Sequence, residues 1–389
     1  MHKLMNNNIT KEDNKAVIDF LKSSPILTNN KKVLEFEKQW SRWLGVKYSV
    51  FVNSGSSANL LTISYLKTIY KKGEIIVPAL TWVSDVTSIL YNGFTPVFVD
   101  IDLNNLSANY DSIKKNINKN TIGIFLTHAL GFSALSDDLI KLIKTKKLIL
   151  IEDVCEAHGA KHKNKKLGTY GKISNFSFYY AHHMSTIEGG MVCTNDKNIY
   201  DTIKVMRSHG MIRESSILSK KQMYFKKYSN LNRDFVFAYP GYNFRSTEIN
   251  AVFGINQIKR LTLNNKKRIN NYNYFLSRLD KSKYYHEFKT KGSCNYAFVI
   301  IFEKKFRNLR FRNKFENILQ KNKIEFRRGT AGGGNQIKQP YLKFFKGKFK
   351  KANNLINTNI IHDYGYYIGN YPDLGREKIN KICKILNNI

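Results

Sequence analysis

The sequence predicts an α/β protein with a mainly parallel central sheet and helices on both faces. Two observations support this fold class. Short apolar runs of strand length alternate with longer stretches in which apolar residues recur at helical spacing. Polar or glycine-rich turns follow several of the apolar runs. This alternation is typical of parallel sheets, whose strands are joined by crossover helices.

The length of the chain predicts two domains. Its 389 residues exceed the roughly 250 to 300 residues at which a single hydrophobic core stops growing. We expect a large domain with N-terminal helices at residues 1–263 and a smaller C-terminal α+β domain at residues 264–389. A hydrophobic content of 42% and an aromatic content of 13% are those of an ordinary globular protein.

The expected elements can be placed in order along the chain. Helical patterns occupy residues 10–45, and further helices are expected from about 53 to 70, from about 83 onward and over 206–213. Apolar runs predict strands at 48–52, 74–78, 95–99, 121–127, 148–152 and 191–194, and the aromatic run at 176–180 is also strand-like. The small domain is expected to contain a linking helix at 264–279, a strand at 296–302, a helix at 309–321 and a strand near 324–326.

The formal net charge of +35 bears on possible partners. Strongly basic proteins often bind nucleic acid or anionic membranes. Here the positive charge is mostly lysine and is scattered through every segment, without an arginine-rich tail or a nucleic-acid-binding motif. We therefore expect no nucleic-acid or membrane partner, and a non-catalytic, basic nucleic-acid-binding protein is a remote alternative.

The cysteines and the apolar segments argue against other classes of protein. Cys155, Cys193, Cys294 and Cys383 lie far apart and form no CxxC pattern, so we expect neither a metal site nor a disulfide framework. The N-terminus has no apolar run of signal-peptide length, and no later stretch approaches 18 uninterrupted apolar residues. We expect a cytoplasmic protein.

Two candidate ligand-binding segments follow predicted strands. The turn at 53–58, which includes Gly55 and Ser56, leads from a strand into a helix. The free N–H groups and the dipole at such a helix N-terminus favour phosphate, although Ser and Gly also cap ordinary helices. Asp153 follows the strand at 148–152, at the edge where ligands of open α/β sheets gather. An aspartate at a strand end can equally be a helix cap.

The third candidate segment spans residues 176–190. It carries the adjacent pair His182 and His183 between an aromatic run and the turn Glu188-Gly189-Gly190, which needs positive φ. Imidazole titrates near neutral pH, so the pair is suited to proton transfer. A structural role in the loop is an equally good reading of the pair alone.

This third segment resembles the active-site segment of the sugar aminotransferase family that depends on pyridoxal 5′-phosphate, which has fold type I. In that family the order is Phe-Ser-Phe, three residues, a lysine, five residues and Glu-Gly-Gly, and the lysine binds the cofactor covalently. His182 stands at the place of that lysine, and no lysine occurs between Ile173 and Asp196. Because imidazole cannot form this bond, the resemblance implies that pyridoxal 5′-phosphate, or its amine form pyridoxamine 5′-phosphate, is bound non-covalently.

The resemblance runs from about residue 10 to the end of the chain and implies the cofactor contacts. Gly55, Ser56 and Ser177 would bind the cofactor phosphate, and Trp82 would stack on the ring. Asp153 would keep the pyridine nitrogen protonated, which makes the ring a better acceptor of electrons. The remaining implied cofactor-binding residue is Glu156, near the hydroxyl group of the cofactor.

The same resemblance implies contacts to a partner subunit and to the substrate. Asn243 lies in a Gly-x-Asn-x-Arg motif that reaches the cofactor of the neighbouring subunit, which implies a homodimer with shared active sites. His209, Arg213, Arg327 and Asn335 are the implied substrate-binding residues. The glycine-rich segment after Arg327 departs from the family pattern, because it has an additional glycine and lacks a proline after the arginine.

Histidine in place of lysine is similar to the sugar 3-dehydratase branch of the family, which acts on nucleotide-linked 4-keto-6-deoxyhexoses. The resemblance implies removal of the C3 hydroxyl, with His182 as general base, glutamate as amino donor and release of ammonia, in the biosynthesis of deoxysugars for surface polysaccharides such as lipopolysaccharide O-antigen. One branch of these enzymes uses closely spaced cysteines for an iron-sulfur cluster, and the scattered cysteines here resemble the other branch. A nucleotide-sugar aminotransferase that dispenses with its lysine is the alternative.

Overall fold

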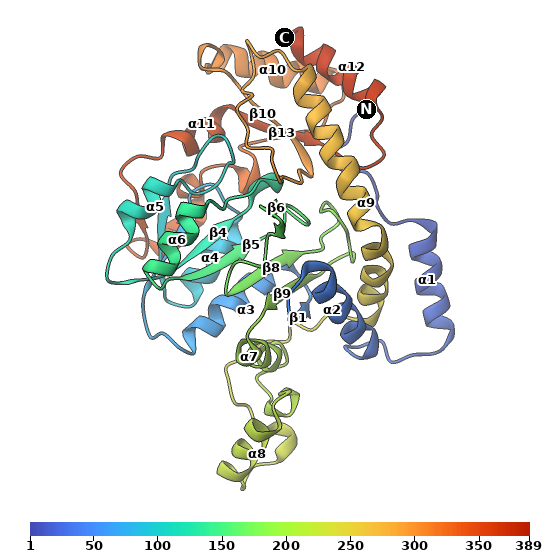
Figure 1. Cartoon of the computed structure of the whole chain (residues 1–389), viewed down its shortest axis with the longest axis vertical. Coiled ribbons are helices and arrows are strands. Elements are labelled where there is room, and N and C mark those ends of the chain that lie inside the picture. Colours follow the sequence, from blue (N-terminus) through green and yellow to red (C-terminus); the bar gives the residue numbers. More distant parts are fainter.

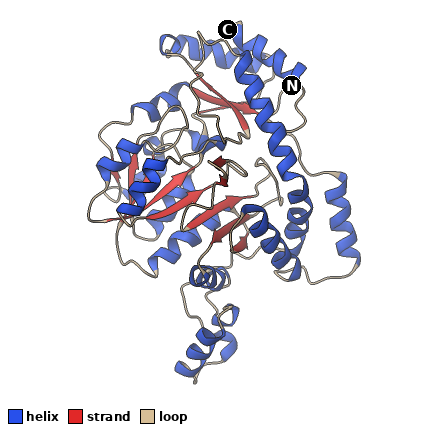
Figure 2. Cartoon of the chain, viewed as in Figure 1, coloured by secondary structure: helices blue, strands red, loops and turns tan.

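The computed structural model describes residues 1–389, apart from the side chain of residue 331. Its centre is a sheet of eight strands in the order β1-β9-β8-β5-β4-β2-β3-β12, with helices on both faces (Figures 1 and 2). The strands are β1 (Tyr48–Val52), β2 (Glu74–Pro78), β3 (Thr95–Val99), β4 (Thr121–Thr127), β5 (Ile149–Asp153), β8 (Ile173–Ser177), β9 (Gly190–Thr194) and β12 (Lys350–Lys351). Strand β9 is antiparallel to β1 and β8, and the other pairings are parallel. The predicted fold class is confirmed.

Helices connect and cover these strands. They are α1 (Lys11–Lys22), α2 (Lys31–Leu44), α3 (Gly55–Lys67), α4 (Val83–Tyr91), α5 (Tyr110–Asn116), α6 (Asp137–Thr145), α7 (Lys197–Arg207), α8 (Leu218–Lys227) and α9 (Glu248–Arg278). Helix α2 shows how the pattern determines the packing, because Val33, Phe36, Trp40 and Leu44 recur at helical spacing and are all buried. In β2 every residue is buried, as expected for a strand covered on both faces.

Three elements differ from the prediction. The aromatic run is not strand beyond Ser177, because the backbone of Phe178 bonds to Gly189 and Thr186 in a tight loop. The helix expected over 206–213 ends at Arg207, because Ser208 leaves the helical backbone angles and the next two residues, His209 and Gly210, have positive φ. The expected linking helix starts earlier, since Thr247 caps α9 by accepting a hydrogen bond from the Asn250 N–H group.

A second, smaller sheet lies at the other end of α9 (Figure 1). It has the order β10-β13-β11, with antiparallel pairing throughout. Its strands are β10 (Ala297–Ile301), β11 (Phe326–Arg328) and β13 (Gly365–Gly369), and its helices are α10 (Leu309–Lys321), α11 (Ile356–Tyr364) and α12 (Arg376–Asn387). A separate hairpin joins β6 (Lys161–His162) to β7 (Lys165–Lys166).

Segments cross between the two parts of the molecule. The predicted boundary between residues 263 and 264 lies inside the continuous helix α9, and β12 from the C-terminal part pairs with β3 of the large sheet. At the N-terminus, His2 forms a parallel bridge with Ile324, and its Nε2 atom lies 2.9 Å from the Gly369 carbonyl oxygen. Both chain termini lie beside α12 (Figure 1). Among the described residues, none of the helices combines the length and hydropathy of a membrane span.

Candidate active site at the carboxyl ends of the strands

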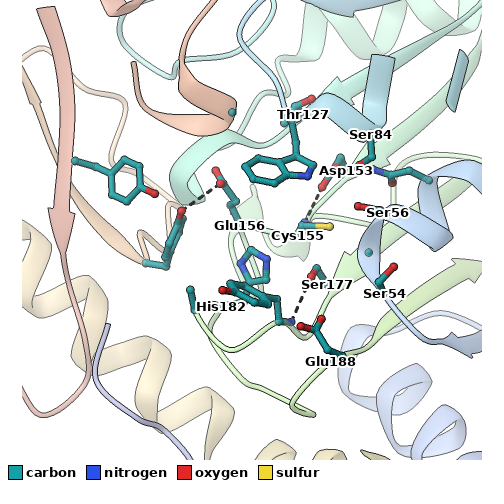
Figure 3. A pocket seen from close by; sticks show the side chains of 18 residues that line it. Ser54, Ser56, Ser84, Thr127, Asp153, Cys155, Glu156, Ser177, His182 and Glu188 are labelled. Carbon is teal, nitrogen blue, oxygen red and sulfur yellow. Dashed lines mark hydrogen bonds between the residues drawn. The ribbon is translucent and has the colours of Figure 1, made fainter. Parts of the chain in front are cut away.

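A cavity of about 370 Å³ lies where β5 and β8 end, between the large sheet and the small one (Figure 3). Most of the predicted cofactor-binding residues and the predicted base line it. Its lining residues are Ser54, Gly55, Ser56, Asn59, Trp82, Ser84, Thr127, Asp153, Cys155, Glu156, Ser177, Tyr179, Ala181, His182, Glu188, Tyr296, Gly332 and Tyr367.

One end of the cavity is built for an anion. Ser54 caps α3 by accepting a hydrogen bond from the Ser57 N–H group at 3.0 Å, so Gly55 and Ser56 form the first turn, whose N–H groups lack intrahelical partners. A Cβ atom added at Gly55 would lie only 2.6 Å from the Cβ atom of Ser177. The absence of a side chain at Gly55 thus lets the helix N-terminus and the Ser177 hydroxyl meet around one site, which fits a phosphate group.

The middle of the cavity presents an aromatic face and a carboxylate. Trp82 precedes α4 and is 51% exposed, so one face of its ring is available to a planar ligand. Asp153 is the last residue of β5 and is only 4% exposed. Its carboxylate accepts hydrogen bonds from the Cys155 N–H group at 2.8 Å and from the Asn59 Nδ2 atom at 3.2 Å. An anion fixed in this way suits a protonated ring nitrogen.

Glu156 joins the two parts of the molecule across the cavity. Its carboxylate accepts hydrogen bonds from the Leu130 N–H group at 2.7 Å and from the Tyr296 hydroxyl at 3.2 Å. Burial raises the pKa of Glu156 to about 7, against the lowering effect of these hydrogen bonds. Tyr296 and its neighbour Tyr367 come from the C-terminal part, which therefore completes the cavity.

The two adjacent histidines point to different environments. His182 lines the cavity, whereas His183 is buried and its Nε2 atom donates a hydrogen bond to the Cys294 carbonyl oxygen at 2.8 Å. The Nδ1 atom of His182 is buried without a hydrogen-bond partner among the described residues. Burial lowers the pKa of His182 to about 4, despite the opposing effect of Asp153. His182 is thus a neutral imidazole at the cavity wall, while His183 belongs to the core.

Three predicted residues lie beyond the cavity on the segment after α7. The side chains of His209, Arg213 and Asn243 are exposed. Asn243 accepts a hydrogen bond from the Arg245 Nε atom at 3.0 Å, and the Arg213 guanidinium lies 5.7 Å from the centre of the Phe235 ring. Their roles toward a substrate or a second subunit stay predictions.

The two predicted residues of the C-terminal segment also lie outside the cavity lining. Arg327 is exposed on β11 and pairs in register with Tyr367, which does line the cavity. Asn335 is 3% exposed, and its side chain bonds to the Asn359 Oδ1 atom at 3.0 Å and to the Ile337 N–H group at 3.0 Å. These bonds occupy the amide of Asn335 in holding the segment together, and its predicted substrate contact stays a prediction.

The sequence patterns missed several lining residues. Asn59 lies one turn beyond the predicted anion-binding turn, so its helical spacing from Gly55 was an available signal. Tyr367 lies in an aromatic and glycine-rich run, but nothing local to Tyr296 or Thr127 indicates that they face a ligand. These residues reach the cavity through the packing of distant segments.

The lining as a whole fits pyridoxal 5′-phosphate and its amine form. It offers a helix N-terminus for the phosphate, an exposed indole for the ring and a carboxylate for the ring nitrogen. None of the described lining residues is a lysine, so the residues fit a non-covalently held cofactor.

Known proteins resemble this chain along most of its length. GDP-4-keto-6-deoxy-D-mannose 3-dehydratase of Escherichia coli O55:H7 is 34% identical over 93% of this chain and 94% of the relative. A crystal structure of GDP-4-keto-6-deoxymannose-3-dehydratase with a trapped PLP-glutamate geminal diamine superposes with a TM-score of 0.91 at 31% identity, over 99% of this chain and 100% of that one. GDP-perosamine synthase of Escherichia coli O157:H7 is 32% identical over 65% of this chain and 64% of the relative. The sequence profile of the DegT/DnrJ/EryC1/StrS aminotransferase family matches residues 7–387, and the chain therefore belongs to that family.

Proposed function

We propose that the protein removes the C3 hydroxyl of a nucleotide-linked 4-keto-6-deoxyhexose with the help of pyridoxal or pyridoxamine 5′-phosphate. The observation that carries this proposal is the neutral His182 at the wall of a cavity whose described lining residues include no lysine. Similarity to the 3-dehydratase over 93% of the chain, against 65% for the perosamine synthase, supports dehydration over amine transfer.

Different residues of the cavity would bind different parts of the cofactor. Gly55, Ser56 and Ser177 would hold the phosphate, Trp82 the ring face, and Asp153 the ring nitrogen. When bound, pyridoxamine 5′-phosphate supplies an amine for the C4 ketone of the sugar and a ring that accepts electrons.

His182 acts in this proposal as the group that moves protons. Burial lowers its pKa to about 4, so at neutral pH its ring carries a free lone pair and can accept a proton. Once protonated, the buried imidazolium is a stronger acid than an exposed one and can donate that proton to the departing hydroxyl oxygen at C3. A single side chain would thus serve as base and then as acid, and water would leave.

The biological setting is part of the proposal. We propose glutamate as the amino donor, ammonia and a 3-deoxy keto sugar as products, and a role in making deoxysugars of surface polysaccharides such as lipopolysaccharide O-antigen. The relative trapped with a PLP-glutamate adduct supports the choice of donor. A cytoplasmic site of action is supported by the free thiols of all four cysteines, which are typical of a reducing compartment.

We also propose a homodimer with shared active sites. The segment from η2 (Ile212–Glu214) to the strand bridge at Phe237, which includes α8, projects from the body of the molecule (Figure 1). Helix α8 has no buried residue. This segment exposes several large apolar side chains, which are Leu218, Met223, Leu231, Phe235 and Phe237. An exposed apolar arm of this kind is typical of a surface that a partner covers.

The reaction is tested by incubating the purified protein with pyridoxal 5′-phosphate, glutamate and GDP-4-keto-6-deoxymannose. Release of ammonia together with a 3-deoxy sugar nucleotide, identified by mass spectrometry, is the expected result. An amino sugar that retains the nitrogen would show the aminotransferase alternative instead. Salt-sensitive DNA binding without any cofactor absorbance would support the remote nucleic-acid alternative.

The shared sites are tested by mixing two inactive variants. If Asn243 acts in the site of the other subunit, Asn243→Ala and His182→Asn homodimers should each be impaired, and hybrids formed by unfolding and refolding the mixture should regain activity, because one site then has both residues intact. Light scattering after size-exclusion chromatography should give twice the chain mass. A monomer by light scattering, or no recovery in the hybrids, would contradict the proposal.

A further inference from the structure

Asp85 is a carboxyl group that the proposed reaction does not use. It lies in the first turn of α4 and has no exposed surface. Its Oδ1 atom accepts a hydrogen bond from the Asn59 Nδ2 atom at 2.7 Å. Its Oδ2 atom is in hydrogen-bond contact with the hydroxyls of Thr81 and Thr127, the latter at 2.8 Å. No Lys, Arg or His of the described part of the chain forms an ion pair with it.

The contacts among Asp85, Thr81 and Thr127 indicate how many hydrogen atoms this cluster must contain. Thr81 Oγ1 and Thr127 Oγ1 also lie 2.6 Å from each other, so these two oxygens and Asp85 Oδ2 form a ring of three mutual contacts. Three hydrogen bonds need three hydrogen atoms, and two hydroxyl groups supply only two. A protonated Asp85 supplies the third, whereas an ionised Asp85 would leave one contact between two oxygens without a hydrogen atom.

Asn59 connects Asp85 to the cofactor site. Its Nδ2 atom lies 2.7 Å from Asp85 Oδ1 and 3.2 Å from Asp153 Oδ2, so a single buried amide group serves both carboxyls. Asn59 is itself fixed, because its Oδ1 atom accepts a hydrogen bond from Asn175 Nδ2 at 2.9 Å. Two carboxyls that share one buried donor cannot both ionise cheaply. Asp153 faces the cavity, while Asp85 has no access to it.

We propose that Asp85 is a neutral carboxylic acid that positions Asn59 and leaves Asp153 as the only anion aimed at the ring nitrogen of the cofactor. In this arrangement the Oδ2–H group of Asp85 closes the threonine ring, and its Oδ1 atom receives the amide. Asp85 acts through Asn59 and Asp153 and is therefore a positioning residue. The inference rests on the cofactor site and is independent of which reaction the sugar undergoes.

The surrounding titratable groups are consistent with this assignment. Burial, together with the nearby Asp153 charge, raises the pKa of Asp85 well above its ordinary value. Cys155 and Tyr341 are titratable groups close enough for the Asp85 charge to affect them, and burial raises the pKa values of both. These neighbours are therefore neutral at pH 7, and none of them supplies a positive charge that would hold Asp85 ionised.

Infrared spectroscopy of the full-length protein labelled with ¹³C-aspartate tests the protonation directly. The label excludes glutamates, Glu156 among them, from the isotope-shifted bands. We expect the wild type at pH 7 to show one protonated aspartate band that disappears in Asp85→Asn and persists in Asp153→Asn. Absence of the band in the wild type, or its loss in Asp153→Asn alone, would overturn the proposal even if Asp85→Asn failed to fold.

The pH dependence of unfolding gives a second measurement. A carboxyl whose pKa is raised in the folded state contributes stability that is fully present below its unfolded pKa, about 3.9, and is lost as the pH rises. As the pH rises from 5 to 8, Asp85→Asn should therefore gain stability relative to the wild type. The ratio of its unfolding equilibrium constant to that of the wild type should fall by about tenfold or more across that interval. A difference that stays flat, or that shifts toward the wild type as the pH rises, would contradict a neutral Asp85.

Binding of pyridoxamine 5′-phosphate separates positioning from charge. Asn can replace the carboxylic acid in both of its hydrogen-bonding roles, so Asp85→Asn should keep the Kd within about threefold, whereas Asp85→Ala should raise it about tenfold, because Asn59 loses its partner. Asp153→Asn should raise the Kd at least as much as Asp85→Ala. If Asp85→Asn and Asp153→Asn weakened cofactor binding equally, Asp85 would act through a negative charge and the proposal would be wrong. No measurement here uses a sugar, so failure of the dehydration assay leaves this result unaffected.

Discussion

The two halves of the cavity are built in different ways. The strand-end half consists of Gly55, Asp153, Ser177 and His182, each at or near the end of a strand of the large sheet. The C-terminal half consists of Tyr296, Gly332 and Tyr367, which the small sheet and a glycine-rich loop bring in. Local chain geometry places the first half, and long-range pairing places the second. We expect the strand-end half to bind the cofactor and the C-terminal half to contribute to recognition of the substrate.

The sharpest test of the strand-end half is His182→Asn. An amide cannot take up the proton that the imidazole accepts, so kcat for dehydration should fall by at least about 10²-fold. Binding of pyridoxamine 5′-phosphate should persist, because the contacts proposed for it lie elsewhere in the cavity. Steady-state ammonia release and absorbance titration measure the two quantities.

His183→Asn is the matched control for this change. It removes the same kind of side chain one residue later, but from a position that bonds to the Cys294 carbonyl oxygen in the core. Its effect on kcat should be far smaller, whatever it does to stability. Near-normal dehydration by His182→Asn combined with loss in His183→Asn would show that the wrong histidine has been assigned.

The second prediction concerns the approach of α3 to β8. In Gly55→Ala the new Cβ would meet the Ser177 Cβ atom at 2.6 Å, so the phosphate end of the cavity must open. Overpacking of this kind costs roughly 1 to 3 kcal/mol, and the Kd for pyridoxamine 5′-phosphate should rise by about tenfold or more. Gly375→Ala is the control, because nothing lies within 4 Å of its added Cβ. An unchanged Kd in Gly55→Ala would contradict the assignment of the cofactor phosphate to this end of the cavity.

The C-terminal half is tested by Arg327→Ala. If this exposed arginine binds the sugar nucleotide, losing a charged hydrogen bond should raise KM by about tenfold with little change in kcat. Arg328→Ala is a suitable control, because Arg328 lies on the same strand but bonds to the Glu316 carboxylate at 3.0 Å. Equal KM values for the two variants would place substrate recognition elsewhere.

The last prediction concerns the stability of the protein and tests Glu156, where the two halves of the cavity meet. Its folded pKa of about 7 lies above the ordinary value, so the stability it contributes is present below about pH 4 and is lost as the pH rises through 7. Relative to the cofactor-free wild type, Glu156→Gln should gain about 1 to 3 kcal/mol between pH 5 and pH 8. Denaturant unfolding measures the gain, and the exposed Glu287→Gln is the control. No gain would mean that Glu156 is ionised throughout.

The contrast between local geometry and long-range pairing also explains which features the sequence could predict. Strand bounds and the register of His182 follow from local patterns, and the structure gives the reason for the spacing. A Cβ at Gly190 would lie 2.2 Å from the Ser54 carbonyl oxygen, so this turn is pressed against the start of α3 and fixes the distance back to the histidine. Spacing is informative where backbone packing leaves no freedom.

The residues that could not be predicted depend on distant partners. Asp85 is buried and contacts threonines from two different segments. No local sequence pattern indicates that this aspartate is buried. Asn335 lies in a glycine-rich run, and its side chain also bonds to the distant Asn359, a contact that no local pattern indicates. The predicted boundary between residues 263 and 264 lies within α9, because the helix continues without a break from Glu248 to Arg278.

The pairing of the first residues with the small sheet affects how the protein folds during synthesis. The His2 N–H group donates to the Lys323 carbonyl oxygen at 2.8 Å, and the Glu325 N–H group donates to the His2 carbonyl oxygen at 2.9 Å. At about 5 to 20 residues per second, the ribosome adds these partners on the order of tens of seconds after His2. The N-terminal segment must therefore wait until residues 323–325 have left the ribosome before it can form these bonds.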